Sequence, residues 1–136
     1  MLTDGRGVPL AIAIDGANVH DQKLLAATLD GIPLGRPRPT RQRPQHLCLD
    51  KGYIGEPVLK VARRRGYTAH VPKRGQEPTP ARRKGRARRW VVERAHSWTN
   101  RARRLLVRWE KKAENYLAFI HLRFAYVALS AAGVLG

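Results

Sequence analysis

The amino-acid sequence predicts an α/β fold. Short apolar runs of β type alternate along the chain with segments whose apolar residues recur at helical spacing. The expected order is strand, helix, strand, helix, strand and then helices. Such an alternation is typical of a sheet layered against helices. Because 136 residues suit one domain of ordinary size, we expect a single domain over residues 1–136.

The first elements are a hairpin and a helix. The apolar run Val8–Ile14 predicts a strand, and the turn residues Asp4–Gly7 before it place Met1–Thr3 at the end of a paired strand. A helix is predicted to begin at Asp21, its expected N-cap, and to end at Gly31. One side of this helix carries the residues expected to face the core, which are Leu24, Leu25, Thr28 and Leu29.

The middle of the chain repeats the alternation. Strands are predicted at 46–49 and 68–71, with a helix at 56–65 between them that Gly66 ends. The strand at 46–49 stops at Asp50. In open α/β sheets, functional side chains gather at the carboxyl ends of strands, so Asp50 is a candidate site residue.

Two long helices are predicted towards the C-terminus, at about 86–109 and 115–132. The first carries an apolar stripe, formed by Val91, Ala95, Trp98, Ala102, Leu105 and Trp109. Glu93 lies off this stripe, in line with Arg86, Arg89, Ser97, Asn100 and Arg104. A simple ion pair between Arg89 and Glu93 is the alternative to a functional role for this carboxylate. The second helix is apolar nearly all round and is expected to be buried.

Positive charge is concentrated in the middle of the chain. The sequence has 27 Lys and Arg against 10 Asp and Glu, a net charge of +17. Two stretches rich in proline and arginine are predicted to be basic loops, at about 33–45 and 72–87. So uneven a charge predicts an acidic partner, with nucleic acid as the first candidate. Flexible linkers whose charge only aids solubility are the alternative.

Composition excludes several classes of protein. A single cysteine, Cys48, allows no internal disulfide and no zinc site built on paired cysteines, and we expect it in the core. The apolar stretch Tyr116–Leu135 contains His121 and Arg123, so a buried helix is favoured over a membrane span. We therefore predict a cytoplasmic protein without a membrane partner.

A few carboxylates within a basic region suggest metal-dependent phosphoryl transfer. Mg²⁺ prefers hard oxygen ligands, usually one or two carboxylates together with phosphate oxygens. Two such ions can stabilise the attacking and leaving oxygens of an in-line displacement. Asp50 and Glu93 are the candidate ligands, although the spacing alone does not say that they meet.

Several motifs resemble, in order, those of the DDE transposases of bacterial insertion sequences. They are Asp50–Tyr53, Trp90–Arg94 and Asn100–Leu105, with Thr3–Leu10, Gly16–Asp21 and Glu114–Phe119 elsewhere. The resemblance covers nearly the whole chain and is nearest to the insertion-sequence family 5 group of the wider family 4-like superfamily. At two positions of the signature around Glu93 the sequence departs from the superfamily, with Arg86 in place of Tyr and Asn100 in place of Lys.

The resemblance implies an RNase H-like (retroviral-integrase-like) core that cuts transposon ends and joins them to target DNA. Two Asp and one Glu of the family hold Mg²⁺ or Mn²⁺, two ions in the complete enzyme. By motif, Asp50 corresponds to the second Asp and Glu93 to the Glu. The residues expected to contact DNA are Lys51, Arg86, Arg89, Arg94, Arg101 and Arg104.

The resemblance also implies that one strand is missing. In the family the first Asp lies on a strand before the Asp4–Gly7 turn, so we expect a core that lacks this strand, from a decayed copy or from a frame joined to an upstream one. Asp4 and Asp15 are the alternatives for the first Asp, but a turn Asp usually caps its own backbone. Partners would be transposon ends and target DNA, with an upstream transposase segment or a second copy of the chain as further candidates.

Two other interpretations stay open at this stage. One is a catalytically inactive DNA-binding remnant, and the other is a basic RNA-binding protein. Trp98 and Trp109 are expected in the core, whereas Trp90 could stack on bases. Arg94, Arg101 and Arg108 recur every seven residues and form a second basic line.

Overall fold

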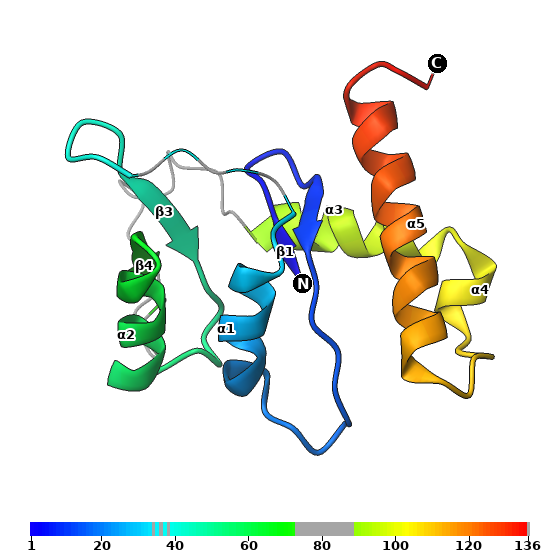
Figure 1. The fold of residues 1–136 in the computed structure, drawn as a ribbon, viewed down its shortest axis with the longest axis horizontal. Coiled ribbons are helices and arrows are strands. Elements are labelled where there is room, and N and C mark those ends of the chain that lie inside the picture. The colour runs from blue at the N-terminus through cyan, green and yellow to red at the C-terminus, as the bar shows by residue number, and fades with distance from the viewer. Residues whose placement is uncertain (34, 36, 38, 73–88, 136) are drawn as a thin grey trace. The chain divides into compact units, whose positions relative to one another are not determined.

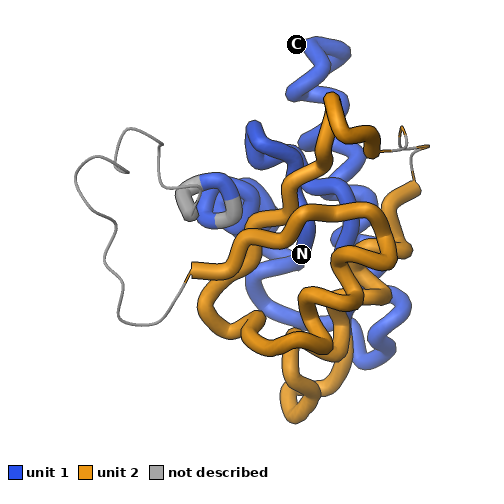
Figure 2. Tube along the Cα trace, turned by 90° about the vertical axis from the view of Figure 1, so that its left-hand side faces the viewer, with its two compact units in different colours: residues 1–14, 87–136 blue, residues 15–86 orange. Residues whose placement is uncertain are grey.

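The computed structural model describes residues 1–33, 35, 37, 39–72 and 89–135, with the side chains of residues 89, 90 and 92 outside that description. The chain forms two compact units, residues 1–14 with 87–136, and residues 15–86 (Figure 2). The first unit holds β1 (Leu2–Thr3), β2 (Pro9–Ala11), α3 (Arg89–Asn100), α4 (Arg103–Leu106) and α5 (Ala113–Ala131). The second holds α1 (Asp21–Asp30), β3 (Gln45–Cys48), α2 (Glu56–Arg64) and β4 (Tyr67–His70) (Figure 1).

The predicted α/β alternation is confirmed, with two small sheets among the described residues. β1 and β2 pair antiparallel as the predicted hairpin. β3 and β4 pair parallel, with α2 as the connection between them, in the register Gln45 to Tyr67 through Cys48 to His70. The two pairs are separate two-stranded sheets rather than one layered sheet. The predicted basic loop at 72–87 lies almost entirely outside the described residues.

The turn of the hairpin is held by its own aspartate. Asp4 Oδ1 accepts hydrogen bonds from the backbone N–H of Arg6 at 2.8 Å and of Val8 at 2.9 Å. Gly7 has φ +89°, and a Cβ there would lie 3.1 Å from the carbonyl oxygen of Val91 on α3. This turn therefore requires both the carboxylate of Asp4 and the missing side chain of Gly7.

Replacing Gly7 with Ala is expected to destabilise the first unit by about 1–3 kcal/mol, because a side chain is strained at this φ and meets a backbone oxygen. Gly5 in the same turn is the matched control, since a Cβ there would meet nothing within 4 Å. Urea unfolding followed by tryptophan fluorescence measures both variants. An equal loss for Gly5→Ala and Gly7→Ala would contradict this account of the turn.

In the second unit α1 packs against α2, and α2 packs against β4 of the parallel sheet. Leu25 and Leu29 of α1 are buried, as are Val58 and Ala62 of α2. At the ends of these helices, Arg65 donates from Nε and Nη2 to the two carboxylate oxygens of Asp30, both at 2.6 Å. This hydrogen bond is the main reason that the pKa of Asp30 lies below its ordinary value.

The start of α1 corrects one detail of the sequence analysis. The N-cap is His20, with extended φ and ψ, and Asp21 is the first helical residue. An acid in the first turn still favours the helix, because its charge opposes the positive end of the helix dipole.

The helix predicted over 86–109 is wrong in its second half, because α3 ends at Asn100. Both Nε and Nη2 of Arg123, on α5, donate to the carbonyl oxygen of Trp98, at 3.0 and 2.9 Å. That oxygen would accept from Ala102 N–H in a continuous helix, but this N–H reaches the Thr99 carbonyl oxygen instead. The Trp98 carbonyl oxygen thus accepts from Arg123 at the point where α3 ends, and the short α4 follows.

The break also changes what the apolar stripe covers. Leu105 of α4 is buried with Ile120 and Phe124 of α5, but Trp109 is 75% exposed and does not belong to the core. The prediction that the last helix is buried all round is wrong as well. Only one face of α5 is buried, and Leu122 is 68% exposed.

Cys48, expected in the core, is exposed. Side chains alternate along β3, and Leu47 takes the buried face, so its neighbour Cys48 points to the other one. Among the described residues no helix is long and apolar enough to cross a membrane.

Candidate functional site

Asp50 lies in a tight turn directly after β3. Its Oδ1 accepts a hydrogen bond from Gly52 N–H at 2.6 Å, and its carbonyl oxygen accepts from Tyr53 N–H at 3.2 Å. The side-chain amide of Gln22 on α1 donates to the Gly52 carbonyl oxygen. The turn is therefore fixed at both sides, and the Asp50 side chain is exposed.

The surroundings of this turn are acidic. Burial raises the pKa of the Tyr53 hydroxyl, and the negative charges of Asp21 and Asp50 raise it further. The turn after β3 thus combines two carboxylates with a half-buried phenol. Lys51, predicted to contact DNA, is exposed beside them.

Glu93 lies on the exposed side of α3. It lines a shallow hollow of about 510 Å³ with His96, Ser97, Asn100 and Arg101. Glu93, Ser97 and Asn100 share one side of the helix, as the spacing predicts. Arg86 and the side chain of Arg89, predicted to stand in the same line, lie outside the described part of the chain.

The two candidate ligands belong to different units. Asp50 is in residues 15–86, and Glu93 is in the unit of residues 1–14 and 87–136. Within the described ranges, no group of three or more His, Cys, Asp or Glu side chains is arranged to hold a metal ion. The contacts described above for Asp50 and Glu93 are therefore contacts within their own units.

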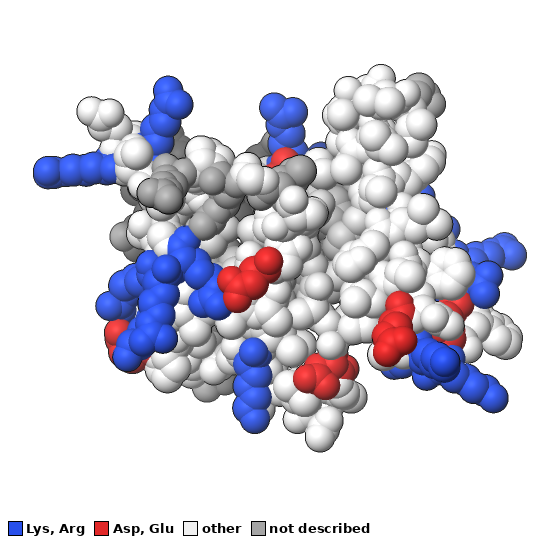
Figure 3. All heavy atoms as spheres, in the orientation of Figure 1, with Lys and Arg blue, Asp and Glu red and all other residues white. Residues whose placement is uncertain are grey.

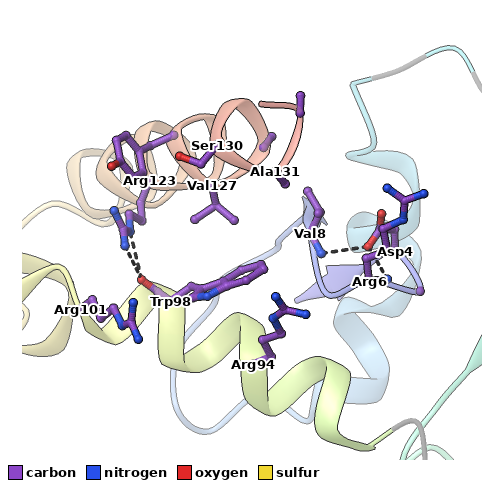
Figure 4. A pocket seen from close by; sticks show the side chains of 14 residues that line it. Asp4, Arg6, Val8, Arg94, Trp98, Arg101, Arg123, Val127, Ser130 and Ala131 are labelled. Carbon is purple, nitrogen blue, oxygen red and sulfur yellow. Dashed lines mark hydrogen bonds between the residues drawn. The ribbon is translucent and has the colours of Figure 1, made fainter. Parts of the chain in front are cut away.

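A larger hollow, of about 840 Å³, lies between α3, α5 and the hairpin turn (Figure 4). Its floor includes Val8, Trp98 and Val127, and the indole of Trp98 lies across it. Four arginines contribute to the lining, Arg6, Arg94, Arg101 and Arg123. The guanidinium of Arg94 lies 4.5 Å from the centre of the Trp98 ring.

The sequence analysis identified Arg94 and Arg101 but missed Arg6 and Arg123. Arg6 lies 88 positions before Arg94 and Arg123 lies 22 positions after Arg101, both outside the basic middle of the chain. The sequence does contain one sign that Arg123 has a role, since it is a single arginine within an apolar helix. Such a charge must find acceptors when the helix packs.

The chain matches the family model of the transposase DDE domain over residues 47–130, more than half of its length. The chain belongs to the DDE transposase family. A relative named "Putative transposase for insertion sequence element IS402", from Burkholderia cepacia, is 38% identical over 127 residues, which cover 90% of this chain and 57% of the relative. The chain therefore spans less than two thirds of that relative's length. No solved structure matches it.

The matched range of this DDE transposase chain includes Asp50, Glu93 and the described arginines Arg94, Arg101 and Arg104. Arg104 is exposed but donates from Nε to Glu110 Oε1 at 2.8 Å. In Figure 3, Lys and Arg side chains gather over α2 and over α4 and the start of α5, with acidic side chains beside them in both places. Ion pairs lie within both groups, Arg63 with Glu56 and Arg65 with Asp30 near α2, and Arg104 with Glu110 after α4.

Proposed function

We propose that this chain supplies part of a transposase that cuts and joins DNA strands with Mg²⁺ or Mn²⁺, using Asp50 and Glu93 as metal ligands. The observation that carries the proposal is the match to the DDE domain over a range that contains both carboxylates. Each is an exposed side chain in a fixed backbone setting, one in the turn after β3 and one on α3. The proposal includes the RNase H-like fold that the family implies.

The chemistry of these side chains fits the ion. Carboxylate oxygens are the hard ligands that Mg²⁺ prefers, and Asp50 uses only Oδ1 to hold its own turn. When bound, such ions supply Lewis-acid stabilisation and activated water. Asp4 fits less well as a further ligand, because its Oδ1 already accepts two backbone N–H groups.

DNA is the substrate in this proposal, and arginines supply the phosphate contacts. Arg94 and Arg101 are exposed beside the hollow of the first unit, and Arg6 adds a third guanidinium there. Guanidinium groups match phosphate oxygens in pairs of hydrogen bonds. Lys51 is proposed to contact DNA beside Asp50. Arg86 and Arg89 remain predictions from the sequence.

The contacts around this hollow can be counted by salt titration. Replacing both Arg94 and Arg101 with Gln is expected to weaken binding to duplex DNA and to reduce the slope of log K against log[salt] by about 2, because two phosphate contacts are lost. Fluorescence anisotropy with a labelled duplex at several salt concentrations measures both quantities.

The control is the double variant Lys23→Gln with Lys60→Gln. It removes two positive charges, as the arginine variant does, but from exposed positions on α1 and α2. The control is expected to keep most of the slope. An unchanged slope in the double arginine variant would contradict the assignment. Tighter binding to duplex RNA of the same length would favour an RNA-binding protein instead.

A further inference from the structure

Two arginines after α3 are held by the same residue, each through its Nε. Arg104 donates from Nε to Glu110 Oε1 at 2.8 Å. Arg108 donates from Nε to the backbone carbonyl oxygen of Glu110 at 3.2 Å. Glu110 thus holds one guanidinium through its side chain and the other through its main chain.

Both guanidinium groups also lie over aromatic rings of α5. The Cζ atom of Arg104 is 4.4 Å from the centre of the Phe119 ring, and that of Arg108 is 5.4 Å from the centre of the Tyr116 ring. Residues three apart on a helix are neighbours on one face, so the two rings form a continuous support. Cation–π contact with these rings restricts each guanidinium in addition to its hydrogen bond.

The exposure of the pair is asymmetric. The side chain of Glu110 is 6% exposed, whereas that of Arg104 is 64% exposed. Glu110 Oε2 is buried and has no hydrogen-bond partner among the described residues. Burying a carboxylate with one oxygen unsatisfied costs free energy, and a surface ion pair returns little. The hydrogen bond from Arg104 nevertheless holds the pKa of Glu110 below its ordinary value, so this buried acid stays charged where it supports a base at the surface.

We propose that Glu110 is a positioning residue that holds Arg104 and Arg108 as a pair of phosphate-binding groups for DNA. Each side chain uses Nε internally, and none of its Nη1 and Nη2 atoms hydrogen-bonds to a residue that the structure describes. Nη1 and Nη2 together can still donate side by side to two phosphate oxygens. This inference rests on the proposed DNA binding, and it adds Arg108 and Glu110 to the residues responsible.

The variant Glu110→Ala of the full chain distinguishes a positioning role of Glu110 from the effect of its negative charge on DNA binding. Removing a negative charge from a protein of net charge +17 should by itself tighten DNA binding. Positioning predicts the opposite, a loss of about ten-fold in affinity at low salt and a salt slope smaller by about 1. Glu110→Gln keeps an acceptor for Arg104 Nε and is expected to retain most of the affinity. Anisotropy of a labelled duplex measures all variants.

Glu114→Ala is the matched control, because it removes the same charge from an exposed position on α5. It is expected to cause no loss. If Glu110→Ala binds as tightly as Glu114→Ala, the inference is wrong while the proposed function stands. If the unmodified chain does not bind DNA, both fail.

Arg104→Lys provides a second arm that does not alter Glu110. Lysine keeps the positive charge but lacks both the Nε–H and the planar set of guanidinium donors. We therefore expect a loss of DNA affinity similar to that of Glu110→Ala. Glu110→Ala should then add little in the Arg104→Lys background. Arg103→Lys, at an exposed neighbour, is the control and should bind like the unmodified chain. Unchanged affinity for Arg104→Lys would overturn the inference.

Discussion

Replacing Glu93 with Gln, or Asp50 with Asn, is expected to reduce metal-dependent strand cleavage by about 10³-fold or more in a transposase that contains this chain. The physical reason is that a carboxylate holding the ion is lost in each variant, and metal ions supply several kcal/mol of transition-state stabilisation. Cleavage of labelled transposon-end DNA, measured with and without Mg²⁺, tests this expectation.

Binding to the same DNA distinguishes a lost ligand from a lost fold. Both variants are expected to bind DNA at least as tightly as the unmodified protein, because each loses a negative charge near the basic surface. Glu56→Gln is the control for cleavage, since Glu56 is an exposed residue of α2 that pairs with Arg63. Cleavage that survives in both variants would refute the assignment of the metal ligands. Cleavage absent from the unmodified transposase would favour the inactive DNA-binding remnant.

The second large effect is expected in the core of the first unit. Phe124→Ala should destabilise this unit by about 3–5 kcal/mol, because it removes a buried ring and leaves a cavity that the surroundings fill only in part. Phe124 is 7% exposed and packs with Leu105 and Ile120. Ile12 and Ile14, which follow β2, pack against the same cluster. The ring therefore joins the hairpin, α4 and α5.

Tryptophan fluorescence during urea unfolding reports this unit, because all three tryptophans lie within residues 87–136. Leu122→Ala is the matched control on the same helix, at a position 68% exposed. It is expected to change the free energy of unfolding by less than about 0.5 kcal/mol. A similar cost for both substitutions would mean that this cluster is not the core of the unit.

Local signals predicted the secondary structure well where neighbouring residues decide it. The turn at Asp4–Gly7 depends on Asp4 and on a glycine with positive φ, both visible in the sequence. Gly66, also with positive φ, follows the end of α2, whereas Gly31 is the C-cap of α1 with φ −77°. The break after α3 could not be predicted, because the group that donates to the Trp98 carbonyl oxygen there, Arg123, lies 25 positions further along the chain.

The candidate site was predicted in part for a similar reason. Asp50 could be identified because it directly follows a strand, and Glu93 because it lies off an apolar stripe. The support of Arg104 and Arg108 by Glu110 was not foreseen. It depends on a loop that returns towards α4 and on two rings of α5 placed under the guanidinium groups.

The sequence by itself determined the α/β alternation, the charge and the family, since these follow from residue types and their spacing along the chain. The tertiary structure decided where α3 ends, which apolar residues form the core, and which surface arginines are restrained by hydrogen bonds and aromatic rings. Those outcomes depend on whether a carbonyl, a carboxylate or a ring from a distant segment reaches a given side chain. Tertiary packing determines which distant groups come into contact, and the spacing of residues within one segment does not predict them.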